Sequence, residues 1–283
     1  MKLIADNLRI THPAIMNALK SHDPKPVQDL VAACAAKKPW AIDINTGPLG
    51  RSPEQDMAFF MDAVQAVTPL PLMIDTSNPR AMEAGVAAAK NEVIINGFSL
   101  EPVKIERILP LAKACGTDIV GFLLYPDSRV PKDAAQRFEI ALSLFEAVEK
   151  AGVDKNRVII DPVVPPLAWE DGIIQAREVL DTIRALPDLL GFPVRTTAGI
   201  SNLATGAPDP GKKQRVTQAY LAMLASAGLS YALIDILDDA LLRTARTASI
   251  LSSERLFAWG MVPGTLQRTG KPGAVNLPEA GGK

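Results

Sequence analysis

Histidine, cysteine and aromatic residues are scarce in this sequence of 283 residues. There are two histidines and two cysteines, and aromatic side chains make up 5% of the chain. No His-x-Cys…Cys set of the kind that binds zinc is present, so we expect no metal site. Cys34 and Cys115 lie in alanine-rich segments, where buried free thiols are the ordinary interpretation.

Long apolar runs and a surplus of one charge are also absent. No segment approaches the roughly 20 apolar residues of a membrane span, and the N-terminus lacks the pattern of a secretory signal. Lys and Arg number 30 against 31 Asp and Glu, a net charge of -1 that disfavours nucleic acid or an anionic membrane surface as partner. We therefore expect a cytoplasmic protein with no membrane and no nucleic-acid partner.

Short apolar segments instead alternate with longer amphipathic ones, which is typical of repeated βα units. The short segments are mostly continuous in apolar residues, as in strands that are covered on both faces. Eight such units favour a closed barrel, and no G-x-G-x-x-G follows the first strand, which disfavours a dinucleotide-binding sheet. Strands are expected at residues 2–6, 41–45, 72–75, 93–96, 118–124, 158–161, 194–199 and 231–235.

The amphipathic segments that follow the strands are expected to be helices. Four of them begin with a proline, a residue that is tolerated in the first helical turn. These prolines are Pro26, Pro53, Pro79 and Pro102. Helices are expected at residues 26–37, 53–67, 79–89, 102–115, 132–151, 169–186, 214–228 and 239–255.

The units together predict one domain. A length of 283 residues is normal for a single barrel of this kind, and no domain linker interrupts the alternation. We assign residues 1–262 to a single (β/α)8 TIM barrel of the α/β class. Residues 263–283 are rich in glycine and proline and are expected to form an irregular C-terminal tail.

Polar side chains close three of the expected strands: Asp75, Asn96 and Asp161 each end an apolar run. In a parallel barrel the carboxyl ends of the strands meet at one face, and that face carries the chemistry. Carboxylates accept hydrogen bonds from N–H groups, while an amide both donates and accepts. The set therefore favours a neutral heterocycle rich in N–H donors, such as a 2-amino-4-oxo pyrimidine ring.

Each of these side chains also has a structural interpretation. Asp75 could cap the helix that follows it, although Ser77 or Asn78 is better placed for that bond. Asn96 could belong to an Asn-Gly turn, and Asp161 could stabilise its own loop through an Asx turn. Their occurrence at equivalent positions on three strands favours the ligand role.

Three further polar residues stand at predicted strand ends. Asp43 and Asn45 close the second strand, and Asp235 closes the eighth. Asp43 and Asn45 could anchor the backbone of the following loop, residues 46–51, or could contact a ligand directly. We treat all three as candidates for supporting the site.

The strand-end motifs, taken together, resemble those of a known family. They are similar to the motifs of the pterin-binding α/β barrels, and specifically of the methyltetrahydrofolate:corrinoid methyltransferases. The resemblance covers residues 6–251, and the motifs occur in the family's order. They are Asp43-Ile-Asn-Thr-Gly-Pro, Asp75-Thr-Ser-Asn, Ile95-Asn96, Asp161-Pro162 and Gly199-Ile-Ser-Asn202.

The resemblance implies a methyl transfer between N5 of a tetrahydrofolate-type pterin, such as 5-methyltetrahydrofolate, and the Co(I) of a corrinoid (cobalamin) held by a partner protein. Asn202, with Asp161 behind it, would strengthen a hydrogen bond at N5 as charge develops there. Members of this family are commonly homodimers, which the resemblance therefore implies here as well. The implied pterin-binding residues are Asp75, Asn96, Asp161, Gly199, Ser201 and Asn202.

Dihydropteroate synthase is the alternative within the same superfamily. Those enzymes normally follow the seventh strand with a Ser-Arg-Lys type segment, whereas Ser201-Asn202-Leu203 contains no basic residue. They also carry a long Gly-Gly-Glu-Ser-Thr-Arg-Pro-Gly loop after the second strand, where this chain has a shorter segment. Both departures favour methyl transfer.

Two positions depart from the methyltransferases instead. Arg9 stands where the family usually has an asparagine near the pterin, and the loop from Tyr125 to Pro131 replaces a Gly-Ile-Pro turn. These departures keep a third alternative open, a pterin-binding protein without turnover. Three basic residues lie at the start of a predicted helix: Lys212, Lys213 and Arg215. They form either a solvated helix start or a positively charged site. Such a site would attract a folate glutamate tail or an acidic surface of a partner protein.

Overall fold

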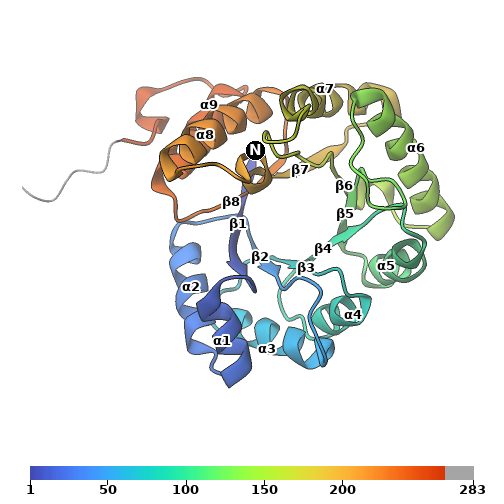
Figure 1. The fold of residues 1–283 in the computed structure, drawn as a ribbon, viewed down its shortest axis with the longest axis vertical. Coiled ribbons are helices and arrows are strands. Elements are labelled where there is room, and N and C mark those ends of the chain that lie inside the picture. Colours follow the sequence, from blue (N-terminus) through green and yellow to red (C-terminus); the bar gives the residue numbers. More distant parts are fainter. Residues whose placement is uncertain (265–283) are drawn as a thin grey trace, which may run out of the picture.

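A closed barrel of eight parallel strands forms the centre of the protein in a computed structural model, which describes residues 1–264 (Figure 1). Each strand pairs in parallel with the next, and β8 closes the ring onto β1. The (β/α)8 TIM barrel is therefore confirmed. The strands are β1 (Lys2–Arg9), β2 (Ala41–Asn45), β3 (Leu72–Asp75), β4 (Val93–Phe98), β5 (Asp118–Phe122), β6 (Val158–Asp161), β7 (Arg195–Gly199) and β8 (Tyr231–Ile234).

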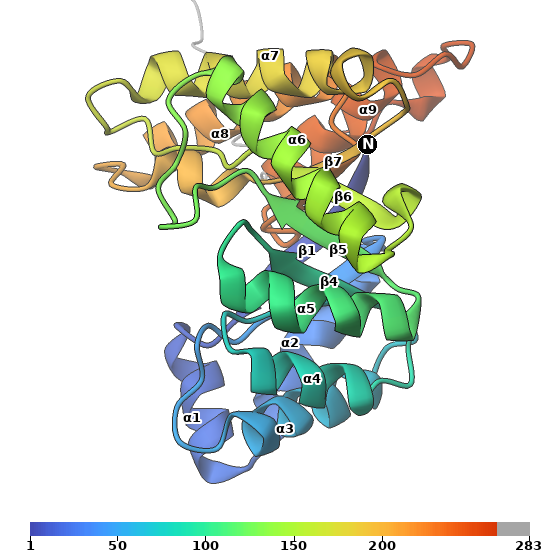
Figure 2. The same ribbon diagram turned by 90° about the vertical axis from the view of Figure 1, so that its right-hand side faces the viewer.

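Helices surround the barrel on the outside, as Figures 1 and 2 show. The expected prolines do stand in the first turns of α2 to α5. Two helices, α1 and α2, lie between β1 and β2, although the sequence predicted only the second. The helices are α1 (Pro13–Ser21), α2 (Lys25–Ala36), α3 (Pro53–Gln65), α4 (Pro79–Ala87), α5 (Pro102–Cys115), α6 (Ala134–Ala151), α7 (Gly172–Leu190), α8 (Pro210–Ser226) and α9 (Asp239–Leu251).

Two element boundaries differ from the prediction in ways that matter for the site. β1 continues to Arg9, because its pairing with β2 resumes after an irregularity between Ala5 and Leu8. α8 begins at Pro210, where the side chain of Asp209 accepts a hydrogen bond from the Lys212 amide at 2.8 Å. An Asp followed by Pro is an ordinary helix start, which the sequence analysis placed four residues too late.

The barrel interior changes from apolar to polar toward the carboxyl ends of the strands. Strand residues including Ile4, Met73, Ile94 and Ile159 form a buried cluster of their own, separate from the larger core under the helices. Side chains alternate between the two faces of a strand, so the residue two positions later also points inward. Those residues are Asp6, Asp75, Asn96 and Asp161.

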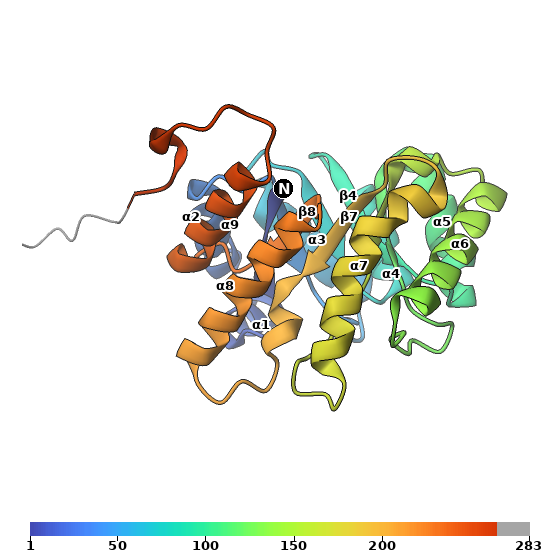
Figure 3. The same ribbon diagram turned by 90° about the horizontal axis from the view of Figure 1, so that it is seen from above.

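The two ends of the barrel are built differently. Figure 3 shows the N-terminus and the segment after α9 at one end, and the loops that lead into α7 and α8 at the other.

Cys34 is buried on α2 as expected, but Cys115 is exposed, because it is the last residue of α5. No helix in residues 1–264 is long and apolar enough to cross a membrane. The predicted tail, apart from its first two residues, lies outside the described residues.

Asn78 is the residue that caps α4. Its side chain accepts a hydrogen bond from the Arg80 amide at 3.0 Å and donates one to the Pro48 carbonyl at 3.2 Å. We expect Asn78→Ala to lower the free energy of unfolding by about 1 kcal/mol, since an N-cap bond is lost. Ser77→Ala is the matched control, because the exposed Ser77 makes no side-chain bond to the described residues. Equal urea midpoints for the two variants would contradict this capping role.

Candidate functional site

A cavity of about 180 Å³ lies at the carboxyl end of the barrel, and every strand contributes to it. We call it the mouth cavity. It brings together all of the residues that the resemblance assigned to pterin binding, together with others that the sequence analysis did not single out. Its lining consists of Asp6, Arg9, Asn45, Asp75, Asn96, Phe122, Asp161, Val163, Gly199, Ser201, Asn202 and Leu233.

The strand register places the first polar side chains side by side. Arg9 pairs with Asn45, Asn45 with Asp75, and Asp75 with Asn96 across four neighbouring strands. Within this row the Nδ2 atom of Asn45 donates a hydrogen bond to Oδ2 of Asp75 at 2.7 Å. Asn45 therefore fixes the orientation of the Asp75 carboxyl group.

The loop after β2 is anchored by other residues than those predicted. Thr76 Oγ1 donates to the Gly47 carbonyl at 2.7 Å, and Asn78 Nδ2 donates to the Pro48 carbonyl. Asp43 and Asn45 make no side-chain hydrogen bond to this loop within the described part of the chain. The loop-anchoring alternative for these two residues is wrong, because both side chains point into the barrel, whereas Thr76 and Asn78 follow the end of β3 beside the loop.

Asp161 combines the two interpretations that the sequence left open. Its Oδ1 accepts a hydrogen bond from the Val163 amide at 2.8 Å, which is the predicted Asx turn. The backbone of Val163 has φ +63°, an unfavourable region for a β-branched residue, and this turn directs its N–H toward Asp161. The second carboxyl oxygen has no hydrogen-bond partner among residues 1–264 and is left for a ligand.

Gly97 explains how β4 presents Asn96. A Cβ atom added at Gly97 would lie 2.1 Å from the carbonyl oxygen of Val120 on β5. Only glycine allows the two strands to approach this closely. Asn96 itself is 6% exposed and faces the mouth cavity between Asp75 and β5.

Burial makes the carboxyl groups of the mouth cavity weak acids. It raises the pKa of Asp161 to about 7, and burial followed by the nearby charge of Asp6 raises the pKa of Asp75 to about 7. Desolvation disfavours the charged form of each group. At neutral pH these carboxyls lie close to the point where they exchange a proton.

Arg9 supplies the guanidinium group of the mouth cavity. Its Nε donates to Oδ1 of Asp6 at 2.8 Å, and its Nη2 contacts the other Asp6 oxygen. The same Nη2 donates to Oγ of Ser201 at 3.0 Å, which links β1 to the segment after β7. Burial raises the pKa of Asp6, and Arg9 opposes that shift.

Asp43 lies one pleat below Asn45 and beneath the mouth cavity. It is 1% exposed, and neither carboxyl oxygen has a hydrogen-bond partner among the residues that the structure describes. Burial, followed by the charges of Asp75 and Asp6, raises the pKa of Asp43 well above its usual range. Burial therefore disfavours the charged form of this carboxyl group.

Asn202 is carried by η2, a 3₁₀ segment (Ile200–Ala204) that directly follows β7. The residue is exposed and stands at the rim of the mouth cavity. The backbone of η2 is held by a hydrogen bond from the Leu167 amide to the Leu203 carbonyl at 2.9 Å. The backbone of Asn202 is thus held in place, and its side chain makes no hydrogen bond to residues 1–264.

Asp235 does not reach the mouth cavity. It accepts a hydrogen bond from Nδ2 of Asn7 at 2.6 Å and another from the Leu237 amide at 3.0 Å. Its carboxylate instead lines a larger neighbouring pocket. Asp235 is therefore a support for the strand ends of β1 and β8.

Several lining residues were missed by the sequence analysis. Asp6 follows Ile4 by two positions, so the alternation of an inward-facing strand was the signal that could have identified it. Phe122 and Leu233 line the cavity as apolar strand-end residues and carry no distinctive sequence signal. Within residues 1–264 no group of three His, Cys, Asp or Glu side chains is arranged to hold a metal ion.

The raised pKa of Asp161 predicts how stability depends on pH. The folded group binds a proton up to about pH 7, while its ordinary pKa is 3.8, so the free energy of unfolding falls as pH rises between these values. We expect Asp161→Asn to remove this contribution. The free energy of unfolding of the variant, minus that of the wild type, should then be about 1–3 kcal/mol larger at pH 8 than at pH 4. Urea unfolding at both pH values measures it. The exposed Asp188→Asn on α7 is the control, and parallel pH profiles for the wild type and Asp161→Asn would refute the prediction.

Comparison with known proteins agrees with this geometry. Residues 40–235 match the family model described as pterin binding enzyme. A methylcorrinoid:tetrahydrofolate methyltransferase from Eubacterium limosum is 24% identical over 238 residues, which cover 83% of this chain and 85% of the relative. A methionine synthase from Mycobacterium leprae is also 24% identical, but over 205 residues, or 68% of this chain and 16% of that protein.

Solved structures show the same fold at low identity. A dihydropteroate synthase from Xanthomonas albilineans superposes with a TM-score of 0.62 at 20% identity, covering 88% of this chain and 91% of that one. A dihydropteroate synthase from Coxiella burnetii superposes with a TM-score of 0.63 at 18% identity, covering 89% and 91%. The family match spans most of the barrel and includes Asp75, Asn96 and Asp161, so this chain belongs to the pterin-binding enzyme family.

Proposed function

We propose that this protein transfers a methyl group between N5 of a tetrahydrofolate-type pterin and the Co(I) of a corrinoid held by a partner protein. The observation that carries the proposal is the convergence of Asp75, Asn96 and Asp161 in one mouth cavity. The similarity to a methylcorrinoid:tetrahydrofolate methyltransferase over most of both chains supports the same activity.

The hydrogen-bonding groups of the cavity suit the pyrimidine edge of a pterin. That edge presents an exocyclic amine and a ring N–H as donors and a carbonyl as acceptor, and the free oxygen of Asp161 can accept from the donors. Asn96 can donate to the carbonyl and accept elsewhere. The N–H donors of the ring would offset the cost of burying the two carboxylates, and this cost is what raises the pKa of Asp75 and Asp161.

Asn202 is the candidate group at N5. The pterin nitrogen is a poor leaving group, so the developing charge there needs a hydrogen bond that strengthens in the transition state. An exposed carboxamide on η2 can turn over the ring and supply that bond, while the proton itself comes from solvent. The reduced corrinoid supplies the nucleophile that takes the methyl group.

The same segment argues against dihydropteroate synthesis. Ser201-Asn202-Leu203 contains no basic residue, and the guanidinium that lines the mouth cavity, that of Arg9, is already bound to Asp6 and to Ser201. A cation that is paired with a carboxylate inside the cavity is less available to an anionic second substrate. The arrangement therefore favours methyl transfer over the alternative expected from the sequence.

The activity can be tested by visible spectroscopy of cob(I)alamin with 5-methyltetrahydrofolate under anaerobic conditions. Loss of the Co(I) spectrum and growth of methylcob(III)alamin, dependent on this protein, are the expected outcome. A parallel assay with a dihydropterin diphosphate and 4-aminobenzoate tests the alternative. Condensation in that second assay, with no methyl transfer in the first, would overturn the proposal.

Removing a pterin-binding side chain should weaken binding without abolishing folding. We expect Asp75→Ala and Asn96→Ala each to cost about 1–3 kcal/mol of affinity for tetrahydrofolate, because donors and acceptors on the ring lose their partners. Anaerobic titration calorimetry measures the change. Asp188→Ala, on the exposed surface of α7, serves as control. Unchanged affinity in both cavity variants would refute the assignment of the pterin site.

Asn202 should affect the rate more than the binding of the pterin. We expect Asn202→Ala to lower the rate of methyl transfer about tenfold or more, with a smaller change in affinity, since its hydrogen bond strengthens in the transition state. Single-turnover kinetics with saturating 5-methyltetrahydrofolate separates the two effects. Lys150→Ala, on the outer helix α6, is the control. Equal rates for the two variants would remove Asn202 from the mechanism.

A further inference from the structure

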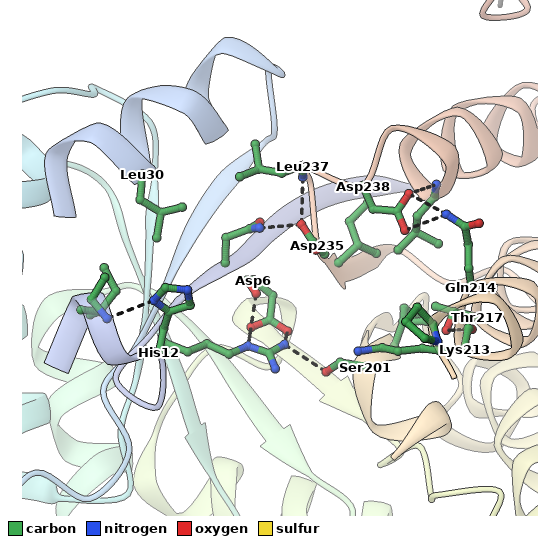
Figure 4. A pocket seen from close by; sticks show the side chains of 18 of the residues that line it. Asp6, His12, Leu30, Ser201, Lys213, Gln214, Thr217, Asp235, Leu237 and Asp238 are labelled. Atoms are coloured by element: carbon green, nitrogen blue, oxygen red, sulfur yellow. Dashed lines mark hydrogen bonds and ion pairs between the residues drawn. The ribbon is translucent and has the colours of Figure 1, made fainter. Parts of the chain in front are cut away.

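Arg137 is the largest side chain that residues 1–264 bury completely. It lies on the inner face of α6 and is 0% exposed. Among the described residues both of its side-chain hydrogen bonds go to backbone carbonyls, and no carboxylate forms an ion pair with it. Figure 4 shows the contrasting guanidinium of Arg9, which binds Asp6 and Ser201. An arginine is rarely buried without such a partner, so its bonds to the backbone need an explanation.

The two bonds of Arg137 connect the start of α6 to the loop that follows β6. Its Nη1 donates to the Asp133 carbonyl at 3.2 Å, one turn back on the same helix. Its Nε donates to the Pro162 carbonyl at 3.0 Å, and this bond lies entirely in the interior. Burial lowers the pKa of Arg137 to about 10, so the side chain still carries its charge at neutral pH. A buried charge is therefore spent on one backbone carbonyl of this loop.

That carbonyl belongs to the turn that carries Asp161. The Leu123 amide donates to the Asp161 carbonyl at 2.9 Å, and the Val163 amide donates to Oδ1 of Asp161 at 2.8 Å. The bond from Arg137 to Pro162 is the third that holds this turn. Val163 has φ +63°, and such a backbone persists where the surrounding structure holds it. Arg137 thus restrains the strained turn from the side of the helices.

The loop itself has few donors that could take over this bond. Its sequence is Pro162-Val-Val-Pro-Pro166, and the three prolines have no N–H group. A buried carbonyl needs a hydrogen-bond donor, so the donor must come from another element. A long side chain from α6 reaches the Pro162 carbonyl, and the nitrogen that does so is Nε of Arg137.

We propose that Arg137 is a positioning residue for pterin binding, which acts through the Pro162 carbonyl to hold the Asp161 turn in place. Arg137 does not line the mouth cavity and does not touch the ring. Its bond fixes the backbone from which Asp161 projects, so one carboxyl oxygen binds the Val163 amide and the other faces the ring. This inference rests on the proposed function, since it places the pterin ring in the mouth cavity.

Two neutral variants of Arg137 form a matched pair. In glutamine the side-chain nitrogen is bonded to Cδ, as Nε is in arginine, so Arg137→Gln keeps an N–H donor at that place. In methionine a methyl group follows the third side-chain atom instead, so Arg137→Met has a similar length and no donor. Both variants remove the same charge. A difference between them therefore reports the hydrogen bond to Pro162 and not the charge or the volume.

The first test is anaerobic titration calorimetry with tetrahydrofolate. Arg137→Met should weaken binding about fivefold, as the loss of one hydrogen bond predicts, and Arg137→Gln should stay within about twofold of the wild type. Leu144→Ala is the control for lost packing, because Leu144 is buried on the same helix and makes no bond to the turn. It should lower the urea midpoint and leave the affinity unchanged.

The second test is the titration of Asp161 in the free protein, followed by carbon NMR of its carboxyl group and assigned with Asp161→Asn. Burial raises the pKa of Asp161, and the bond from the Val163 amide lowers it. When the turn loosens in Arg137→Met, this bond weakens and the pKa should rise above its wild-type value. Arg137→Gln should leave it unchanged. A side chain that only filled the core would produce no difference between the two variants.

The outcomes separate this inference from the proposed function. Equal affinities and equal Asp161 titrations for Arg137→Met and Arg137→Gln would overturn the role of Arg137 and leave the pterin site intact. A wild type that does not bind tetrahydrofolate would overturn the proposed function, while the titration still tests how Arg137 positions Asp161. If Arg137→Met does not fold, the wild type decides. The Nε–H resonance of Arg137 should then shift on ligand binding while that of Arg195, at the opposite end of the barrel, does not, and an unmoved Arg137 signal would overturn the inference.

Discussion

The parallel register of the closed barrel is the constraint on which the site depends. Because adjacent strands are paired in parallel, their carboxyl ends open at one face, and every strand contributes a residue to the same cavity. The row from Arg9 through Asn45 and Asp75 to Asn96 follows directly from this pairing. A shift of one residue in any strand would turn its polar side chain away from the others.

The site is also shaped by a shortage of positive charge. Asp6, Asp43, Asp75 and Asp161 lie in or under the mouth cavity, where Arg9 is the guanidinium that faces them. Burial without enough partners raises the pKa of each carboxyl, which lowers the stability of the fold at a pH where the carboxyls are charged. A neutral ring that brings its own N–H donors offsets the cost, whereas an anionic ligand would increase it. The charge distribution of the mouth cavity thus favours a neutral ligand over an anionic one.

Much of the fold was predictable because it rests on local patterns. Continuous apolar runs located all eight strands, and prolines in first turns located α2 to α5. The errors have physical reasons: α1 is short and begins at a histidine cap, and β1 continues past an irregularity through polar residues. The polar ends of β3, β4 and β6 could be identified from sequence, since each follows an apolar run.

Partners of side chains were much harder to predict than their positions. Nothing local in the sequence indicates that Asn45 holds Asp75, or that Arg9 reaches Ser201 across 192 positions of chain. Asp43 was expected either to anchor the loop after β2 or to contact a ligand, and it is instead buried under the cavity. The direction in which β2 points this side chain is set by the barrel and not by the local sequence. Such contacts depend on how strands distant in sequence meet.

The hydrogen bond between Leu167 and Leu203 joins the segment after Asp161 to the segment that carries Asn202. These two segments form neighbouring parts of the cavity rim, so a shift of one backbone is transmitted to the other. A displacement of the Asn202 segment would therefore strain this bond unless the segment that follows Asp161 moved with it. The position of Asn202 and the orientation of Asp161 are thereby linked through the backbone.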